Sequence, residues 1–267
     1  MNHKKISSTT ASIIAGFVLI SAGAAPAFAQ TASSTRLGGM RARTGANAST
    51  TAAREAQMVK NADNQIANRI SALNALETRV NAMQKLSGTE KSSLSSQIQS
   101  QIATMTALQS QIATDESDNN TSSLKTDIQS ITKAYRIYML IIPQGTIAAA
   151  ADRVMAIANA MTTLSGALQT RITQAQSAGA AMSASVSALA DLNTKAADAT
   201  TQAQNAVTAT ASLAPDNGST AVMQANTAAL KTDRTDIQTA QKDLAAARQD
   251  AVTIVAALKA AEKSTTP

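Results

Sequence analysis

The feature that most constrains the fold is a spacing of large apolar residues by three and four positions, which recurs over most of the chain. Between residues 49 and 86, one apolar series repeats every seven residues, and a second follows three residues after members of the first. Residues at this spacing form one stripe along an α-helix. The two series are Val59, Ile66, Leu73 and Val80, and Ala62, Leu76 and Met83. The pattern predicts helices that pack through apolar seams.

The same spacing predicts six helices, and the residues between them are typical of helix ends and loops. Ser87, Gly88 and Thr89 combine a glycine that ends one helix with a residue that caps the next. Residues 115–123, Gly179 and residues 214–219 mark further turns. Ala, Gln, Ser and Thr fill the positions outside the stripes, and nothing in this composition favours a sheet. The predicted helices are 49–86, 89–114, 121–142, 144–178, 181–213 and 219–263.

Pro143 and Gly145 interrupt the third stripe, which restarts at Ile147. Proline removes a helical hydrogen bond and kinks or ends a helix. We therefore predict an all-α fold of elongated antiparallel bundles: a three-helix bundle over residues 49–142 and a second over 143–267, in series and joined by a helix kinked at Pro143. One longer bundle, with the two sets of helices side by side, is the alternative.

The first 29 residues have the features of a signal peptide. Lys4 and Lys5 precede an apolar stretch, and Ala27 and Ala29 form an Ala-x-Ala site before Gln30. We expect cleavage between Ala29 and Gln30, and hence a secreted or periplasmic protein without a membrane span after cleavage. The rival interpretation, an uncleaved anchor, needs roughly 20 consecutive apolar residues.

Residues 30–48 are rich in Gly, Ser and Thr and contain three arginines but almost no large apolar side chain. Such a segment cannot bury enough surface to offset the entropy of ordering it. We interpret it as a flexible basic leader, which serves either as a spacer or for weak adhesion to an anionic surface.

Composition excludes several kinds of chemistry. The chain has no cysteine, and its one histidine, His3, lies in the predicted signal peptide. Hydrolytic triads need a base, usually histidine, beside a serine or cysteine nucleophile. A serine with a lysine base is conceivable, but that spacing carries no specificity in a chain rich in both. We predict no catalytic residues, no cofactor and no enzyme activity.

The charge balance argues against a nucleic-acid partner. Five of the 23 basic residues precede Ser49 and none of the 17 acidic residues does, so the remainder of the chain has a net charge of +1. A nearly neutral domain lacks the broad basic surface that binds nucleic acid. We therefore expect no nucleic-acid binding.

The acidic loop at residues 115–120 is the one segment whose composition resembles that of a metal site. A calcium loop beginning at Asp115 would need glycine at its sixth position and glutamate at its twelfth, where Asn120 and Thr126 stand. We predict a solvated turn between two helices and no metal site.

The densest apolar run after the signal peptide is residues 135–142, which includes Tyr135 and Tyr138. We expect this run to lie in the core, in register with the preceding stripe. The alternative is a contact patch centred on Tyr135 and Tyr138, because exposed apolar patches usually mark interaction sites. The run is too short to span a bilayer.

Polar residues also fall on or near the apolar seams. Such residues lower stability but fix helix register, so we expect Leu in place of Asn226 or Asp233 to raise the melting temperature. The residues are Arg69, Arg171, Asn226 and Asp233.

Two segments carry a resemblance to other proteins: SLKTDIQSITKAYRIYMLIIPQG at 123–145 with AAAADRV at 148–154, and LAPDNGS at 213–219 with Val222, Met223 and AALK at 228–231. Through them the chain resembles a group of predicted secreted, coiled-coil-like, all-helical proteins of uncultivated bacteria. The resemblance implies export and a helical fold, and it brings no activity and no site residues.

These observations favour an exported, non-enzymatic helical scaffold, spacer or interaction protein of the cell envelope or exterior. Its partner would be a protein or a cell-surface component, or a second copy of the chain. The alternative is a holdase-like or ligand-binding protein that holds apolar guests in grooves between Ala-rich helices.

Overall fold

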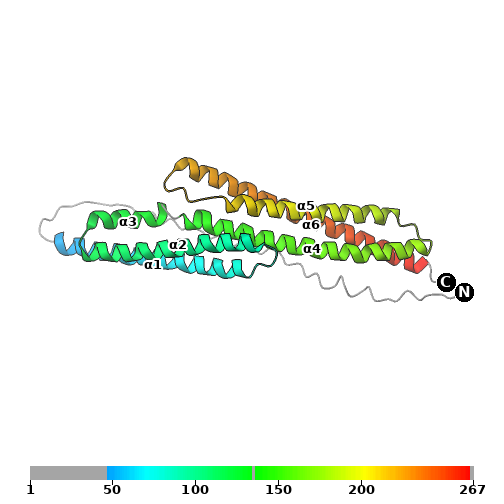
Figure 1. The fold of residues 1–267 in the computed structure, drawn as a ribbon, viewed down its shortest axis with the longest axis horizontal. Helices are drawn as coiled ribbons and strands as arrows, with labels where there is room; N and C mark the ends of the chain where they lie inside the picture. The colour runs from blue at the N-terminus through cyan, green and yellow to red at the C-terminus, as the bar shows by residue number, and fades with distance from the viewer. Residues whose placement is uncertain (1–46, 134–135, 265–267) are drawn as a thin grey trace. The chain divides into compact units, whose positions relative to one another are not determined.

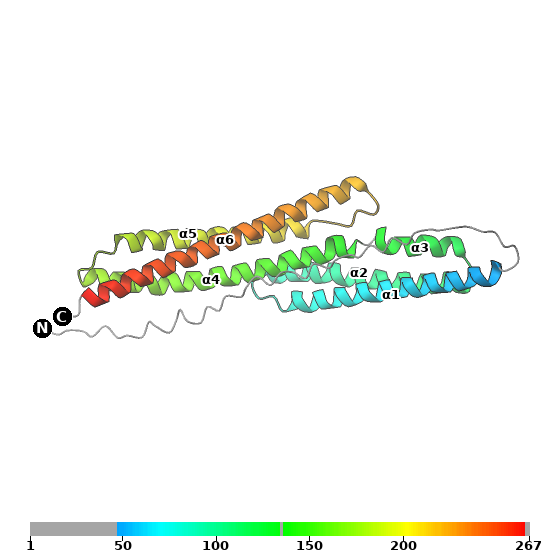
Figure 2. The ribbon, with the colours of Figure 1, turned by 180° about the vertical axis from the view of Figure 1, so that it is seen from behind.

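The computed structural model describes residues 47–133 and 136–264, and every regular element in this part of the chain is helical. Figures 1 and 2 show the helices from opposite sides. Consecutive helices that pack together run antiparallel, as the apolar stripes predict. The elements are α1 (Asn47–Asn81), α2 (Gly88–Ser117), α3 (Thr121–Lys133), the π-helix η1 (Ile137–Ile141), α4 (Ile142–Ser177), α5 (Ser183–Ala211) and α6 (Thr220–Ser264).

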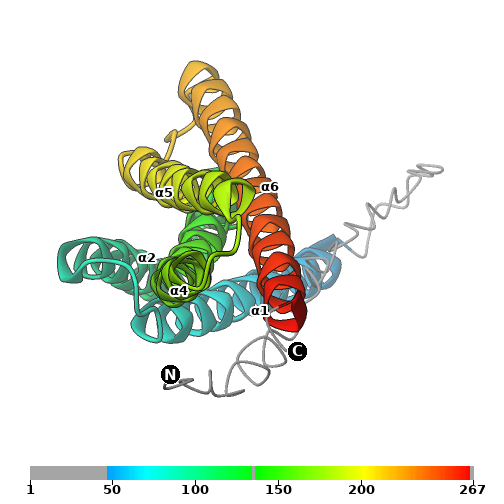
Figure 3. The ribbon, with the colours of Figure 1, turned by 90° about the vertical axis from the view of Figure 1, so that its right-hand side faces the viewer.

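The helices pack in two groups. In one group α1 and α2 pack together and α3 contacts both of them, and in the other α4, α5 and α6 contact one another. Smaller contacts, of α1 with α4 and of α2 with α5, connect the groups. In the end-on view of Figure 3, α4 lies between the pair α5 and α6 and the pair α1 and α2. The long helix α4 is therefore the element through which the groups meet.

The start of α2 has a capping box in which Ser87 is the cap and Gly88 is the first helical residue, whereas the sequence predicted that Gly88 ends the preceding helix. The Ser87 Oγ accepts a hydrogen bond from the backbone N–H of Glu90 at 3.2 Å, and the Glu90 carboxylate accepts one from the N–H of Ser87 at 2.8 Å. This reciprocal pair satisfies donors that the first helical turn leaves free. The turn after α4 contains Gly179 with φ 88°, a left-handed conformation that favours glycine. A turn lies at each predicted position, but α1 ends at Asn81, five residues before the predicted end at residue 86.

The interruption between the third and fourth predicted helices differs from the expectation. The described part of α3 reaches Lys133, and Arg136, with φ 39°, has a left-handed backbone before η1 begins, so no single helix extends to residue 142. Pro143 lies in the first turn of α4, which follows η1 directly, so the proline stands in a helical run that begins at Ile137. The described chain departs from helical geometry at Arg136, upstream of Pro143, and a kink at Pro143 stays a prediction.

Gly145 also has a different role from the expected one. It is buried inside α4, and a Cβ built on it would lie 2.2 Å from Cδ1 of Leu76. The glycine thus allows α4 to approach α1 closely. Its physical function is close packing between helices, and its part in a kink stays a prediction.

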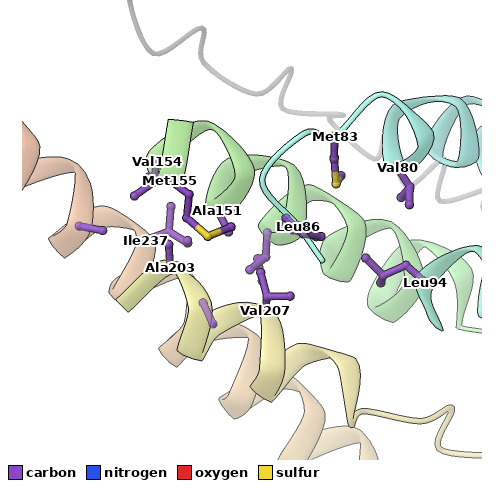
Figure 4. Packing of buried hydrophobic residues seen from close by; sticks show 14 of the residues in the cluster. Val80, Met83, Leu86, Leu94, Ala151, Val154, Met155, Ala203, Val207 and Ile237 are labelled. Atoms are coloured by element: carbon purple, nitrogen blue, oxygen red, sulfur yellow. The ribbon is translucent and has the colours of Figure 1, made fainter. Parts of the chain in front are cut away.

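The core is continuous through the described helices. The series Val59, Ile66, Leu73 and Val80 is buried, as its spacing predicts. Figure 4 shows Val80, Met83, Leu86 and Leu94 near Ala151, Val154, Met155, Ala203, Val207 and Ile237. Side chains from both groups of helices therefore contribute to one cluster.

Ile157 of α4 and Val186 of α5 have helical apolar spacing in the sequence but are exposed, at 39% and 41%. Alanines occupy much of the seam of α5, where Ala196, Ala199 and Ala203 are fully or almost fully buried. Small side chains let helix axes approach closely, so a seam lined by alanine leaves larger neighbours at its edge. The hydrophobic scale alone ranks Val186 above these alanines and assigns the wrong residue to the seam.

Candidate functional site

The π-helix η1 exposes two large apolar side chains. Ile137, Leu140 and Ile141 are buried, whereas Tyr138 is 47% exposed and Met139 is 52% exposed. A π-helix is short and rare, and such turns are frequent at functional sites. The three buried residues anchor the turn in the core and leave Tyr138 and Met139 facing solvent. We call this pair the η1 patch.

Arg69 of α1 borders the η1 patch. Its guanidinium carbon lies 5.3 Å from the centre of the Tyr138 ring, within the range of a cation–π contact. The same guanidinium donates a hydrogen bond to the carbonyl of Gln65 at 3.1 Å. Partial burial lowers the pKa of Arg69, and the proximity of Tyr138 opposes that shift. The contact holds one face of the tyrosine ring and leaves the remainder available.

The structure describes one of the two tyrosines of the predicted contact patch. Tyr135 lies outside the described residues. Tyr138 is half-exposed, so the expectation that this residue lies in the core is wrong. Its role as a contact residue stays a prediction.

The loop between α5 and α6 packs beside η1 through Asp216. The Arg136 Nε lies 2.9 Å from the Asp216 Oδ2, and the Asp216 side chain is only 3% exposed. The Nε–H bond does not point at the oxygen, so the contact is an ion pair without an aligned hydrogen bond. The other carboxylate oxygen, Oδ1, accepts a hydrogen bond from the N–H of Gly218 at 2.8 Å. Asp216 therefore shapes its own turn and attracts Arg136.

Gln144 of α4 fixes the beginning of that loop. Its buried Nε2 donates to the carbonyls of Thr210 at 2.7 Å and Leu213 at 3.1 Å. These carbonyls lie at the end of α5, where helical partners are missing. From the other side, the Gln97 Nε2 of α2 donates to the carbonyl of Ala211 at 3.3 Å. The end of α5 is thus held by α2 and α4 together.

Asp152 of α4 has a comparable role at the connection between α1 and α2. Its Oδ1 accepts hydrogen bonds from the backbone N–H groups of Lys85 and of Leu86, the latter at 3.2 Å. A carboxylate that accepts from backbone donors makes a charge-assisted bond. Sequence reasoning singled out neither Gln144 nor Asp152, because each acts on a backbone segment about 66 residues away and leaves no local pattern.

A pair of carboxyl groups joins α2 to α3. Asp115 is buried, with its Oδ1 3.4 Å from the Gln111 Nε2. Burial raises the pKa of Asp127, and a hydrogen bond to Asp115 and the charge of Asp115 raise it further. The predicted solvated turn therefore includes one buried acid.

Among residues 47–133 and 136–264, no three His, Cys, Asp or Glu side chains lie close enough together to hold a metal ion. The side chains around η1 offer apolar area, a guanidinium and amide groups. Groups of this kind bind partners by contact and hydrogen bonding.

The polar residues near the seams have different environments. Arg171 pairs with Glu262 of α6, and the Asn226 Nδ2 donates to the carbonyl of Ala214 at 2.8 Å. Asp233 is 3% exposed, and no hydrogen-bond donor in the described part of the chain reaches its Oδ2. Leucine in place of Asn226 would remove the hydrogen bond to Ala214 in the loop between α5 and α6. We therefore expect a gain in stability only from a substitution of Asp233.

One stretch, within Thr121–Ser177, has the length and apolar composition that could cross a membrane. Half of its most apolar window is buried in the protein, and the core helix of a soluble protein meets the same criteria. We therefore assign its apolar character to the core.

No family model matches the sequence, and no curated protein and no solved structure is found to be similar to it. The predicted cleavage site, Ala27, Ala29 and Gln30, lies outside the described residues. Cleavage and the resemblance to secreted helical proteins both stay predictions.

Proposed function

We propose that the chain is an exported, non-enzymatic helical scaffold that uses the η1 patch to contact a protein or cell-surface partner. The observation that carries this proposal is the exposure of Tyr138 and Met139 on a turn whose other three residues are buried. Aromatic residues and methionine are enriched at protein interfaces. A rigid support lowers the entropy that binding costs.

We also propose that the scaffold consists of two antiparallel three-helix bundles in series. The contacts among α1, α2 and α3, and those among α4, α5 and α6, support this arrangement. The break between α3 and η1 would then separate the bundles and place the η1 patch near their junction. The first bundle would then consist of α1–α3 and the second of η1–α6, in place of the predicted ranges 49–142 and 143–267.

The test compares capture of partners from intact cells by three forms of the mature chain, read by mass spectrometry. The first form is unchanged, and the second carries Tyr138→Ser and Met139→Ser. The third, a matched control, carries Val222→Ser and Val252→Ser, which remove two other exposed apolar side chains, both on α6. We expect a specific partner to be retained by the unchanged and control forms and lost from the second form. Equal capture by all three would refute the role of the η1 patch.

The alternative function, a holdase, predicts a different result. A holdase suppresses the aggregation of several unrelated unfolded proteins, whereas a scaffold with one contact patch does not. Light scattering from two chemically denatured test proteins, with and without the mature chain, separates these functions. The export step is tested by N-terminal sequencing of the processed protein, which should begin at Gln30.

A further inference from the structure

The backbone at Arg136 adopts a conformation that its local sequence does not favour. Its φ and ψ are 39° and 33°, which is the left-handed region. A residue with a Cβ occupies that region at a cost, and arginine is not among the types enriched there. The apolar spacing of residues 121–142 also predicts a helix that continues through this position. Contacts from elsewhere in the fold must therefore hold the break.

The closest such contact is the ion pair with Asp216. Among the described residues, Arg136 is the one cation within ion-pairing distance of the Asp216 carboxylate. The carboxylate is almost fully buried, so its attraction for the guanidinium is weakly screened. The carbonyl of Arg136 meanwhile accepts hydrogen bonds from the N–H groups of Met139 at 3.1 Å and Leu140 at 2.8 Å. Any rotation at Arg136 would therefore disturb the first turn of η1.

The Asp216 side of the contact is fixed without Arg136. The N–H groups of Gly218 and Ser219 both donate to Asp216, each at 2.8 Å. Gln144 holds the carbonyls of Thr210 and Leu213 at the start of the loop. Loss of the ion pair should leave this loop in place. The segment that would move is therefore the one that contains Arg136.

We propose that the Arg136–Asp216 ion pair is a latch that holds Arg136 in its strained, left-handed conformation before η1. When the latch opens, Arg136 returns to right-handed φ and η1 loses its π-helical hydrogen bonds. Tyr138 and Met139 then project in a different direction from α4. This conformational device goes beyond the proposed function, because it concerns the chain itself and holds for any partner.

The first test is hydrogen exchange of the η1 amides, followed by mass spectrometry of the mature chain. Asp216→Asn removes the charge but leaves an oxygen that can accept from Gly218. Arg136→Ala removes the cation and keeps the Cβ. Both should speed exchange at residues 137–141 by about tenfold, a factor in the range that left-handed strain in a non-glycine residue implies. Arg136→Gly removes the strain together with the cation, so its exchange should stay within about threefold of the parent.

The matched control is Asp250→Asn, which breaks another ion pair, with the Lys195 Nζ at 2.9 Å, between α5 and α6. Exchange at residues 137–141 should not change in this variant. Unchanged exchange in both latch variants would overturn the proposal, and so would equal acceleration in the control. Equal acceleration in the Arg136→Gly and Arg136→Ala variants would overturn it as well, because strain would then play no part.

A second measurement follows the helices on the two sides of the break. The chain has no cysteine, so Lys125→Cys on α3 and Thr201→Cys on α5, both exposed, allow specific spin labelling. We expect one narrow distance in the parent and in Asp250→Asn, and an added second distance in Asp216→Asn. A single unchanged distance in Asp216→Asn would contradict the latch. If the Arg136→Ala chain does not fold, the Asp216→Asn results decide.

Discussion

At the scale of single residues, three positions show that packing determines the effect of a residue on stability. Gly145 and Gly166 both lie inside α4, yet a Cβ at Gly145 would collide with Leu76 and a Cβ at Gly166 would meet nothing within 4 Å. Asp233 is as buried as the leucines around it but carries a carboxylate without a donor at its Oδ2. In each case the neighbouring helix determines the effect of the residue.

The glycines give the first prediction. Gly166→Ala should stabilise the protein by about 0.5–1 kcal/mol, because alanine favours the helix over glycine. Gly145→Ala gains the same propensity, but overpacking against the buried Leu76 costs roughly 1–3 kcal/mol, so we expect a net loss of about 1–2 kcal/mol. Denaturant unfolding of both variants measures the difference. If the two variants were equally stable, α4 would not pack closely on α1 at Gly145.

The second prediction concerns the stability contributed by Asp233. Burial, and then the neighbouring Asp236, raise the pKa of Asp233. The folded state therefore binds this proton more tightly than the unfolded state, so its contribution to stability is full at low pH and declines as pH rises above the ordinary aspartate value of about 3.9. Asp233→Asn should stabilise the protein by about 1–2 kcal/mol at pH 7, because it removes a poorly partnered buried charge.

The measurement for Asp233 is the melting temperature from pH 3 to pH 7. The advantage of Asp233→Asn over the parent should grow with pH. Asp198→Asn, an exposed position on α5, serves as the control and should show little change. An advantage that shrinks with pH would mean that Asp233 is stabilised as a carboxylate in the fold.

At the scale of helices and turns, the ends of elements are held by side chains from distant helices. Ser87 and Glu90 cap α2 locally, in a pattern that the sequence reveals. Asp152 and Gln144, both on α4, hold the connection before α2 and the end of α5. α4 therefore has two functions: it packs through its apolar stripe, and it closes the hydrogen bonds of two turns.

Asp152 provides the prediction at this scale. Asp152→Ala leaves the N–H groups of Lys85 and Leu86 without their acceptor, and we expect a loss of about 1–3 kcal/mol. Asp152→Asn keeps an oxygen that can accept, so it should cost less. Denaturant unfolding gives the energies, and hydrogen exchange at residues 85–86 should accelerate only in the alanine variant. Equal losses in the two variants would indicate that the charge, and not the hydrogen bonds, matters.

At the scale of the whole molecule, the two groups of helices are joined by several contacts of different kinds. Leu76 packs on Gly145, Asp152 caps the connection between α1 and α2, and Gln97 of α2 holds the end of α5. Because these contacts are spread along α4 and α5, the groups should unfold together in one cooperative transition.

A variant that combines Asp152→Ala with Gln97→Ala should divide that transition in two. We expect α1–α3 to unfold at the lower temperature, since the described part of α3, with 13 residues, is the shortest α-helix of the two groups and short helices are marginal without tertiary support. Calorimetry resolves the transitions, and the two single variants are the controls. One transition in the combined variant would show that apolar packing alone couples the groups.

The sequence determined the class of fold and most of the core. Apolar residues recur at helical spacing, so residues such as Ile66, Leu73 and Met105 could be assigned to buried seams without any structure. Local signals also located the turns at Ser87 and Gly179. Such features depend on neighbours within one helical turn, which the sequence displays directly.

The tertiary structure decided the features that depend on distant segments. It shows that the helical geometry breaks at Arg136, and that Tyr138 is exposed. It also shows which distant segments Gly145, Gln144 and Asp152 contact. Each of these results requires knowledge of which helix lies opposite. Spacing along a chain shows which residues share a face, but the approach of another helix determines which of them are covered.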